Sequence, residues 1–317
     1  MCTLNHTKNN GMKIFVIVVT YNGMMNDWIS KCLLSLQNSS IKVQTIVVDN
    51  NSSDATVNFI AENFPEILII ESKTNLGFGG ANNLGLKKAL ELHGDYFFLL
   101  NQDAYVDHTT IEKLINISQS NPEYAVISPV HLNGKGDALD KSFGRSISPY
   151  YCKGLYEDYF LEKRKKEIYE AEFICAAAWL LPKKTLKLIG GFSPAFFHYG
   201  EDDNYCHRVH YYNMKIGVVP NTYIYHDRED RPKSIYDERI ISMQRQYTLW
   251  CSNPTKHIDI TTLLSQYRNK MLKYVLTGNF GEAKNSKKIH TFLKENKQII
   301  VDSYNQSITN KSYKFII

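Results

Sequence analysis

The chain has 317 residues, of which 43% are hydrophobic and 22% charged, and its formal net charge is +5 at pH 7. These values are typical of a globular protein with a sizeable core, and the length allows one large domain or a domain with an appendage. The six cysteines form no C-x-x-C pair, which argues against a zinc site or a disulfide framework and favours a reducing compartment.

The chain carries no pattern typical of a targeting or membrane-spanning segment. Its first dozen residues are polar, so we expect no signal peptide. No apolar run approaches the roughly 18 residues that a transmembrane helix needs. The sequence therefore predicts a cytoplasmic protein.

Positive charge is concentrated in the last part of the chain. From Lys256 onwards there are eleven Lys and Arg and four acidic residues, which gives 11 − 4 = +7. This basic segment is consistent with peripheral contact with an anionic membrane or an acidic partner, and equally with the solvated face of a packed helical pair.

Apolar strand patterns alternate with helical patterns in the first hundred residues. Strands are predicted over 13–19, 44–48, 67–71 and 96–100, and helices over 28–36, 57–64 and from the glycine-rich segment 75–83 to about 92. Strands joined by helices of this length predict βαβ units and a largely parallel sheet.

The second half is less regular. A loop is predicted over 133–159, a charged connector over 162–172, a strand over 173–181 that ends at Pro182, a short helix over 183–189, an edge-like strand ending at His226, and helices from about Tyr236 onwards.

Polar residues follow each of the first four predicted strands. They are Thr20-Tyr21-Asn22, Asp49-Asn50-Asn51, the segment Asn75 to Asn83, and Asn101-Gln102-Asp103. In a parallel sheet these clusters lie along one edge, where open α/β sheets bind ligands. An aspartate there can accept a hydrogen bond from the N3–H group of uracil or thymine, and the glycines allow close approach of backbone to a ligand.

Two other nucleotide-binding classes fit less well. The glycines Gly77 and Gly79 follow the third strand rather than the first, and Asn82 stands where a dinucleotide-binding fingerprint has Gly or Ala. A nucleotidyltransferase would carry a basic glycine-rich loop after the first strand, whereas residues 21–25 contain no Lys or Arg.

The second half adds an acidic triplet, Glu201-Asp202-Asp203, ahead of a helix that contains Arg208, and then His226. Acids at a helix N-terminus are often only partners of the helix dipole.

Seven motifs in this order resemble the family 2 glycosyltransferases, and within them the bacterial rhamnosyltransferase-like branch. They are V-V-T-Y-N (18–22), V-V-D-N-N-S-S-D (47–54), N-L-G-F-G-G-A-N-N (75–83), L-L-N-Q-D (99–103), G-G-F (190–192), Y-G-E-D-D (199–203) with Arg208, and His226. The resemblance implies a GT-A fold over residues 12–227, an α/β architecture with a mostly parallel central sheet, followed by a helical C-terminal extension over 228–317.

The resemblance also implies roles for individual residues. Asp202 matches the catalytic base, and Asp103 and His226 match ligands of a divalent ion, Mg²⁺ or Mn²⁺. The nucleotide and donor side comprises Thr20, Tyr21, Asn22, Asp49, Asn51, Asn75, Gly77, Gly79, Ala81, Asn101 and Gln102. The acceptor side comprises Trp179, Glu201 and Arg208.

The function that the resemblance implies is inverting transfer of rhamnose or a hexose from a dTDP- or UDP-sugar to a saccharide or lipid-linked acceptor in bacterial surface polysaccharide synthesis. One base and no nucleophile on the opposite face imply a single displacement. Three residues depart from the family pattern. Asn101 stands at the position of a metal ligand, and Asn204 stands where the family has an acid two residues after the base. Ala176 replaces the more common Gly behind the donor sugar. The alternative is a non-catalytic nucleotide-sugar-binding relative that assists a partner enzyme.

Overall fold

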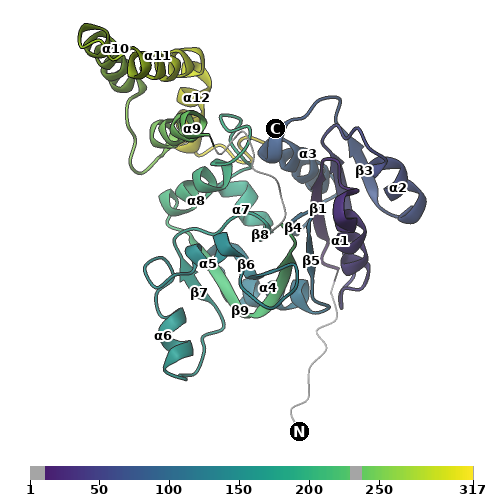
Figure 1. Cartoon of the computed structure of the whole chain (residues 1–317). Coiled ribbons are helices and arrows are strands. Elements are labelled where there is room, and N and C mark those ends of the chain that lie inside the picture. The colour runs from purple at the N-terminus through teal and green to yellow at the C-terminus, as the bar shows by residue number, and fades with distance from the viewer. Residues whose placement is uncertain (1–10, 229–237, 317) are drawn as a thin grey trace.

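The computed structural model describes residues 11–228 and 238–316. Two of the predictions concern residues outside these ranges. They are the absence of a signal peptide, which rests partly on residues 1–10, and the start of the C-terminal helices at about Tyr236. The centre of the molecule is a nine-stranded sheet with the order β3-β2-β1-β4-β8-β6-β9-β5, and β7 pairs with β9 (Figure 1).

The first half forms the expected parallel unit. Its strands are β1 (Ile14–Thr20), β2 (Gln44–Asp49), β3 (Leu68–Glu71) and β4 (Tyr96–Asn101), and its helices are α1 (Trp28–Gln37), preceded by the 3₁₀ turn η1 (Met25–Asp27), α2 (Thr56–Asn63) and α3 (Gly77–Glu91). Alternate β1 side chains enter different cores, Phe15 and Ile17 on one face and Val16 and Val18 on the other. Burial on both faces explains why β1 is apolar throughout.

The second half of the sheet is mixed. It contains β5 (Ala104–Val106), β6 (Tyr124–Asn133), β7 (Tyr169–Ala171), β8 (Ala178–Pro182) and β9 (Lys215–His226). β8 runs antiparallel to both β4 and β6, β5 and β7 run antiparallel to β9, and β6 and β9 are parallel. The parallel arrangement therefore holds for the first four strands, and the sheet changes direction at β8.

Several local predictions for the second half are wrong. The predicted loop 133–159 contains α5 (Lys141–Ser146) and α6 (Leu155–Phe160), and the predicted charged connector contains β7. Only the end of the predicted strand 173–181 is extended, as β8. The strand that ends at His226 is not at an edge, because β9 lies between β6 and β5. The strand β6 was also not predicted from the sequence. The remaining helices of this half are α4 (Thr110–Ser120), α7 (Lys183–Leu188) and α8 (Glu201–Tyr211).

The C-terminal part forms a helical lobe, as expected. It consists of α9 (Arg239–Ser252), α10 (Ile260–Leu276), α11 (Phe280–Glu295) and α12 (Lys297–Ser307), with a small core of its own around Tyr267, Ile289 and Leu293. Figure 1 shows the α10–α11 hairpin projecting away from the sheet. Within the two described ranges, no helix combines the length and apolar character required to span a bilayer.

The last described residues return from this lobe to the sheet. The backbone N–H of Gly191 donates to the carbonyl of Lys314 over 2.9 Å, and Asn83 of α3 donates to the carbonyl of Phe315 over 3.0 Å. Ile316 is 6% exposed and belongs to the same core cluster as β1 and α3. The chain near its C-terminus thus lies beside α3 (Figure 1) and contributes to the packing of the sheet domain.

Candidate active site

The structure brings the predicted polar clusters to one edge of the sheet. Thr20 at the end of β1 is in register with Asp49 at the end of β2, and Val19 is in register with Asn101 at the end of β4. The side chains that follow these strands therefore meet at a common rim.

Gln102 connects two of these strand ends. Its Oε1 accepts hydrogen bonds from the hydroxyl of Thr20 (2.6 Å) and the backbone N–H of Tyr21 (3.0 Å), and its Nε2 donates to the carbonyl of Tyr21 (3.1 Å). Gln102 and Thr20 thus fix the shape of the rim, while the ring of Tyr21 is 48% exposed beside it.

Asp49 presents a buried acceptor at the same rim. Its Oδ2 accepts from the backbone N–H of Ser52 (3.0 Å), and Asn22, in a left-handed conformation, accepts from the N–H of Ser53 (2.8 Å). Within the residues that the structure describes, Oδ1 of Asp49 is buried and has no hydrogen-bond partner. Such an atom usually has a partner in the functional state, and a ligand N–H or O–H group is suited to it. Asn51, also left-handed, is exposed next to it.

Asn50, which was not among the predicted site residues, organises the start of α3. Its Oδ1 accepts from the N–H of Leu76 (2.7 Å), and its Nδ2 donates to Oδ1 of Asn75 (3.0 Å). Asn75 in turn accepts from the N–H of Gly77 (2.9 Å). This network explains why an Asn-rich strand end faces an Asn-rich helix start.

The glycines of α3 serve packing rather than approach to a ligand. A Cβ on Gly77, whose φ is +72°, would lie 1.9 Å from the carbonyl oxygen of Phe197, and one on Gly79 would lie 2.8 Å from Cβ of Phe192. Ala81 is fully buried in the core. The expectation that Gly77, Gly79 and Ala81 contact the donor is therefore corrected: they let α3 pack closely against the segment that leads to α8.

Asp103 and His226 meet between β4 and β9. Nε2 of His226 lies 3.4 Å from Oδ1 of Asp103 and 3.4 Å from Nδ2 of Asn101, and both Asp103 and His226 are almost completely buried. The pairing of Ala104 with His226 in the β5–β9 ladder places the two side chains together. This is the juxtaposition that the resemblance implies.

Asp140 and Arg228 lie behind this pair, and neither was predicted. Nδ1 of His226 is 3.5 Å from Oδ2 of Asp140, and Oδ1 of the same carboxylate caps the N-terminus of α5. Arg228 donates to both carboxylate oxygens of Asp140, over 2.7 and 2.6 Å. Although burial opposes it, hydrogen bonding to Arg228 and Phe143 keeps the pKa of Asp140 below its ordinary value. Asp140 is therefore ionised at neutral pH and orients the imidazole.

The acidic triplet forms the first turn of α8, after Gly200 in a left-handed conformation. Burial raises the pKa of Asp202, against the lowering effect of the N–H groups of Asp203 and Ala176. Burial and the neighbouring charge of Asp202 raise the pKa of Asp203 to about 7, and burial raises that of Glu201 well above its usual range. Three clustered, poorly hydrated carboxyl groups include one suited to proton transfer near neutral pH.

The segment Cys175–Ala177 joins the two groups of acids. The carbonyl of Ala177 accepts from the N–H of Asn101 (3.0 Å), next to Asp103, whereas Ala176 donates to Asp202. Burial raises the pKa of the Cys175 thiol to about 12; the charges of Asp202 and Asp140 add to this rise, and the charge of Arg228 opposes it. Asp202 and Asn101, whose side-chain amide lies 3.4 Å from Nε2 of His226, thus bond to neighbouring residues of one short segment.

Comparisons with known proteins show the family of this chain. A family model described as "Glycosyl transferase family 2" matches residues 15–189, more than half of the chain. The chain belongs to glycosyl transferase family 2.

Three curated relatives of this family 2 chain carry sugar-transferase names. It is 28% identical over 173 residues to the low-salt glycan biosynthesis hexosyltransferase Agl10 of Haloferax volcanii, covering 54% of this chain and 55% of that protein. It is 21% identical to the dTDP-rhamnosyl transferase RfbF of Shigella flexneri (70% and 71% covered) and 19% identical to an N-acetylglucosaminyl-diphospho-decaprenol L-rhamnosyltransferase of Mycobacterium tuberculosis (67% and 75%). The matched region thus spans only about half of the Haloferax protein.

Solved structures show the fold. The structure of GalNAc-T7 with UDP, GalNAc and Mn²⁺ superposes with a TM-score of 0.57 at 14% identity, covering 78% of this chain and 51% of that one. Staphylococcus aureus TarS residues 1–349 with UDP-GlcNAc superposes with a TM-score of 0.55 at 14% identity, covering 93% and 90%. The family 2 chain has the expected GT-A fold.

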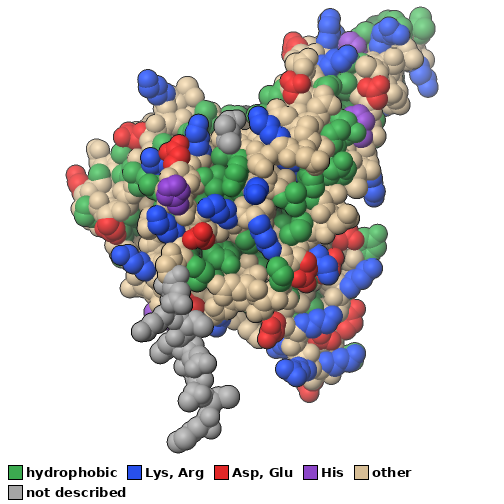
Figure 2. Space-filling model, turned by 180° about the vertical axis from the view of Figure 1, so that it is seen from behind, with side chains coloured by type: hydrophobic (Ala, Val, Ile, Leu, Met, Phe, Trp, Pro, Cys, Tyr) green, Lys and Arg blue, Asp and Glu red, His purple; other side chains and the backbone are tan. Residues whose placement is uncertain are grey.

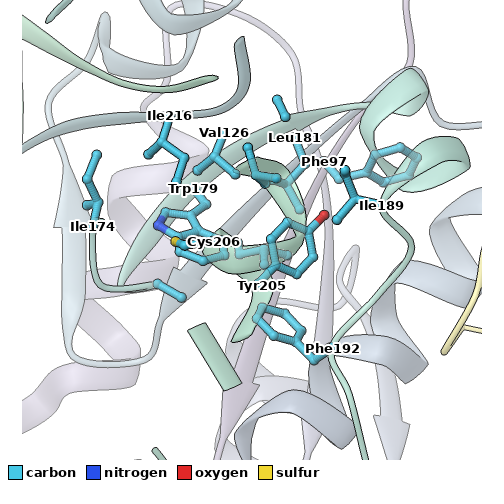
Figure 3. Close-up of a cluster of buried hydrophobic side chains, with 14 of the residues drawn as sticks. Phe97, Val126, Ile174, Trp179, Leu181, Ile189, Phe192, Tyr205, Cys206 and Ile216 are labelled. Atoms are coloured by element: carbon cyan, nitrogen blue, oxygen red, sulfur yellow. The ribbon is translucent and has the colours of Figure 1, made fainter. Parts of the chain in front are cut away.

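Two residues predicted for the acceptor side lie in the core of this GT-A domain. Trp179 is 0% exposed and packs against Phe192 and Tyr205, as Figure 3 shows. Arg208 is also 0% exposed and donates to the carbonyls of Ile189 (2.6 Å) and Gly191 (2.7 Å). Neither side chain has surface available to an acceptor, so this expectation is corrected for both.

Asn204 and Glu201 also have clear environments in the family 2 chain. Oδ1 of Asn204 accepts from Nε of Arg208 (3.1 Å), and its Nδ2 donates to Ser252 of α9 (3.2 Å), so this departure from the family pattern supports a buried arginine. Glu201 is 4% exposed, and a Cβ on Gly79 would lie 3.6 Å from its Cβ. Glu201 therefore faces α3 rather than an open acceptor surface.

Arg245 of α9 is a further residue that sequence reasoning missed. Its side chain passes over the ring of Tyr199 at 5.4 Å and lies beside Gly200, immediately before the triplet. Its charge lowers the pKa of Glu201, Asp202 and Asp203, each by less than burial raises it. The helical lobe thus contributes a cation to the catalytic end of the sheet domain.

The donor atoms at Asp103 and His226 fit a divalent ion that takes its other ligands from a diphosphate and water. When the imidazole proton is on Nδ1, facing Asp140, Nε2 directs its lone pair toward Asp103, which is the arrangement that metal-bound histidines adopt. Among the described residues, no group of three or more His, Cys, Asp or Glu side chains is placed to hold a metal. A metal here would depend on the diphosphate for much of its coordination.

Asp203 makes the stability of this family 2 chain depend on pH. Its pKa of about 7 exceeds the ordinary value of 3.8, so between these values the folded state keeps a proton that the unfolded state has lost. The free energy of unfolding should therefore fall as pH rises through this window, by at most about 4 kcal/mol for this group. We expect Asp203→Asn to remove this decrease and to be more stable than the wild type above pH 7, measured by urea unfolding at a series of pH values.

The exposed acid Asp302 on α12 supplies the control for this experiment. Asp302→Asn should show the pH dependence of the wild type. A wild type and an Asp203→Asn variant with the same pH dependence would contradict the environment assigned to Asp203.

Proposed function

We propose that the chain is an inverting glycosyltransferase that moves a rhamnosyl or hexosyl group from a dTDP- or UDP-sugar to a saccharide or lipid-linked acceptor. The observation that carries the proposal is that neighbouring residues of one segment bond to both groups: Ala176 donates to Asp202, and Ala177 accepts from Asn101, whose side-chain amide lies 3.4 Å from His226 of the Asp103–His226 pair. The relatives named as rhamnosyl and hexosyl transferases support the substrate class. We place this activity in the cytoplasm, in the synthesis of a bacterial surface polysaccharide.

The residues divide the reaction between a nucleotide side and an acceptor side. On the nucleotide side, the unpartnered Oδ1 of Asp49 accepts a hydrogen bond from the N3–H group of uracil or thymine, between Tyr21 and Asn51. On the other side, Asp202 removes the proton of the acceptor hydroxyl as that oxygen attacks the anomeric carbon. The bond from this carbon to the diphosphate oxygen breaks with its electron pair on the diphosphate. Displacement from the opposite face inverts the anomeric configuration.

The leaving diphosphate requires positive charge. Mg²⁺ or Mn²⁺ held by Asp103 and His226 would supply it by neutralising the charge that develops on the phosphate oxygens. Asn101 occupies the position of a further carboxylate ligand and contacts Nε2 of His226 instead. Asp140 and Arg228 keep the imidazole in place from behind.

A second candidate is a nucleotide-sugar-binding protein without turnover, which assists a partner enzyme. Asn101 is the feature that favours it, because it leaves two rather than three protein ligands at the metal position. Asn204 no longer supports this alternative, since its amide anchors Arg208 in the core.

A panel of nucleotide sugars distinguishes the two candidates. We expect dTDP-rhamnose or a UDP-hexose to raise the melting temperature, because a ligand that binds only the folded state stabilises it. The same donor should be hydrolysed slowly, and faster with Mn²⁺ or Mg²⁺, with release of the nucleoside diphosphate. Tight binding without turnover of any donor would favour the binding protein, and no binding of any nucleotide sugar would contradict both.

A further inference from the structure

The outer end of the α10–α11 hairpin is an ordered turn with apolar side chains on its surface. Gly278, with a φ of +72°, ends α10, and its backbone N–H donates to the carbonyl of Val275 (3.1 Å). Asn279 then caps α11 by accepting from the N–H of Glu282 (3.2 Å). The turn therefore holds the residues on both sides of it in fixed positions.

Four large apolar side chains at this turn are exposed, and we call them the hairpin tip. They are Leu272 (55%), Val275 (49%), Leu276 (87%) and Phe280 (69%). The core of the helical lobe lies elsewhere on the hairpin, around Leu263, Tyr267 and Ile289. Aliphatic and aromatic groups gathered on one surface are unfavourable in water and indicate a binding partner.

Positive charge surrounds the hairpin tip. Six exposed cations and one acid, Glu282, lie between positions 268 and 288, which gives 6 − 1 = +5; the cations, called here the tip cations, are Arg268, Lys270, Lys273, Lys284, Lys287 and Lys288. Figure 2 shows green hydrophobic and blue basic side chains side by side at the outer end of this lobe.

An anionic lipid surface matches both features of this end of the hairpin. Apolar side chains enter the boundary between headgroups and acyl chains, while Lys and Arg contact the lipid phosphates. Nucleic acid would engage the cations but leaves no place for Leu276 and Phe280. A second copy of the chain would bring two sets of tip cations against each other, which opposes symmetric association. We propose that the hairpin tip and the tip cations dock this protein on an anionic membrane surface.

Docking at this end would hold the active site in a fixed relation to the bilayer. α11 packs on α9 in the core of the helical lobe, and α9 places Arg245 beside Gly200 and the acidic triplet. A rigid connection of this kind suits an acceptor that is itself attached to lipid. The docking proposal does not depend on the sugar-transfer proposal, because it rests on the hairpin surface alone.

Vesicle sedimentation of the full chain, without any nucleotide sugar, tests the proposal. We expect binding to vesicles of equal parts phosphatidylcholine and phosphatidylglycerol, weakened by added salt, and no binding to phosphatidylcholine alone. The charge variant Lys273→Gln/Lys284→Gln/Lys287→Gln should bind about 100-fold more weakly, at roughly fivefold per lysine. The apolar variant Leu276→Ser/Phe280→Ser should lose about tenfold or more of its affinity for the vesicles per substituted side chain.

A control variant carries matched changes at the opposite end of the molecule. Lys42→Gln/Lys73→Gln/Leu68→Ser alters two exposed lysines and one exposed leucine around β2 and β3, far from the hairpin in Figure 1. It should bind mixed vesicles like the wild type. The proposal is overturned if the wild type does not bind mixed vesicles, if both tip variants bind unchanged, or if the control loses as much as they do. A dimer that only the apolar variant dissociates, without vesicle binding, would assign the surface to a second copy.

Discussion

Asp202→Asn should lower the turnover number by about 10²–10⁴-fold while leaving nucleotide affinity nearly unchanged. The amide has the shape of the carboxylate but cannot accept the proton of the acceptor hydroxyl. Asp202 lies at the start of α8 and receives hydrogen bonds from the backbone of Asp203 and Ala176, which an amide oxygen also accepts. The local structure should therefore be retained. Steady-state kinetics with a responsive donor, together with nucleotide titration by calorimetry, measures both quantities.

The neighbouring acid provides the matched control. Asp203→Asn changes the same functional group one position further along the same helical turn, and we expect a much smaller loss of turnover. Equal losses in the two variants would assign catalysis to the triplet as a unit. A large loss of turnover in Asp203→Asn, together with normal turnover in Asp202→Asn, would assign the role of base to Asp203 instead.

Asp103→Asn and His226→Gln should each abolish most of the stimulation by divalent metal, with a loss in turnover of roughly 10²–10³-fold at saturating donor. Each change replaces one of the two side chains whose atoms, Oδ1 of Asp103 and Nε2 of His226, lie 3.4 Å apart. Asp140→Asn should lower the affinity for the metal by about 10–100-fold without removing a ligand, because the imidazole of His226 loses the carboxylate that orients it. Mn²⁺ titrations of activity and of binding in the presence of UDP measure these effects.

Asp227→Asn is the control for the metal experiment. Asp227 follows His226 directly, but its carboxylate is directed to Lys31 at 3.6 Å and is 30% exposed. Its substitution should leave the response to Mn²⁺ intact. Turnover that survives chelation in the wild type and persists in Asp103→Asn would contradict the metal assignment.

The first four strands were predictable because their physical signal is local. Burial on both faces requires a continuous apolar run, and the run in β1 or β4 is long enough to stand out from the surrounding pattern. β6 is also buried along almost its whole length, but Ser128, Pro129 and His131 interrupt its apolar run. β7 has no such run at all. β7 has three residues with an exposed Glu170 at its centre, and only its pairing with β9 makes it a strand. Long-range pairing of this kind leaves no trace in local sequence.

The same distinction applies to the site. Asp49 and Asp103 stand at strand ends, so their place at the rim follows from the alternation of strands and helices. The meeting of Asp103 with His226 followed from the family resemblance, since no spacing connects residues so far apart. Asp140 lies in the segment 133–159 that was predicted as a loop, and nothing local indicated that its carboxylate caps α5 and faces His226.

Trp179 and Gly79 illustrate the opposite error. A tryptophan or a glycine near a motif resembles a ligand contact when only residue type is considered. In the structure, Trp179 fills the core beneath α8, and Gly79 provides room for Phe192. Residue type indicates what a side chain is able to do, whereas the packing of α3 and α8 determines which side chains are buried and which are available to a ligand.

The return of Lys314–Ile316 to the sheet domain affects how the protein is made. On the ribosome, α3 and the segment around Gly191 emerge long before this stretch does. Until this stretch is synthesised, Asn83 lacks one of its two carbonyl acceptors, that of Phe315, and Arg208 lacks one of the two aromatic rings that cover it at 4.8 Å. A chain that ends after α12 should therefore lack part of the packing that holds α3 and α8. The close packing of these two helices is in this way completed only when Lys314–Ile316 have been synthesised.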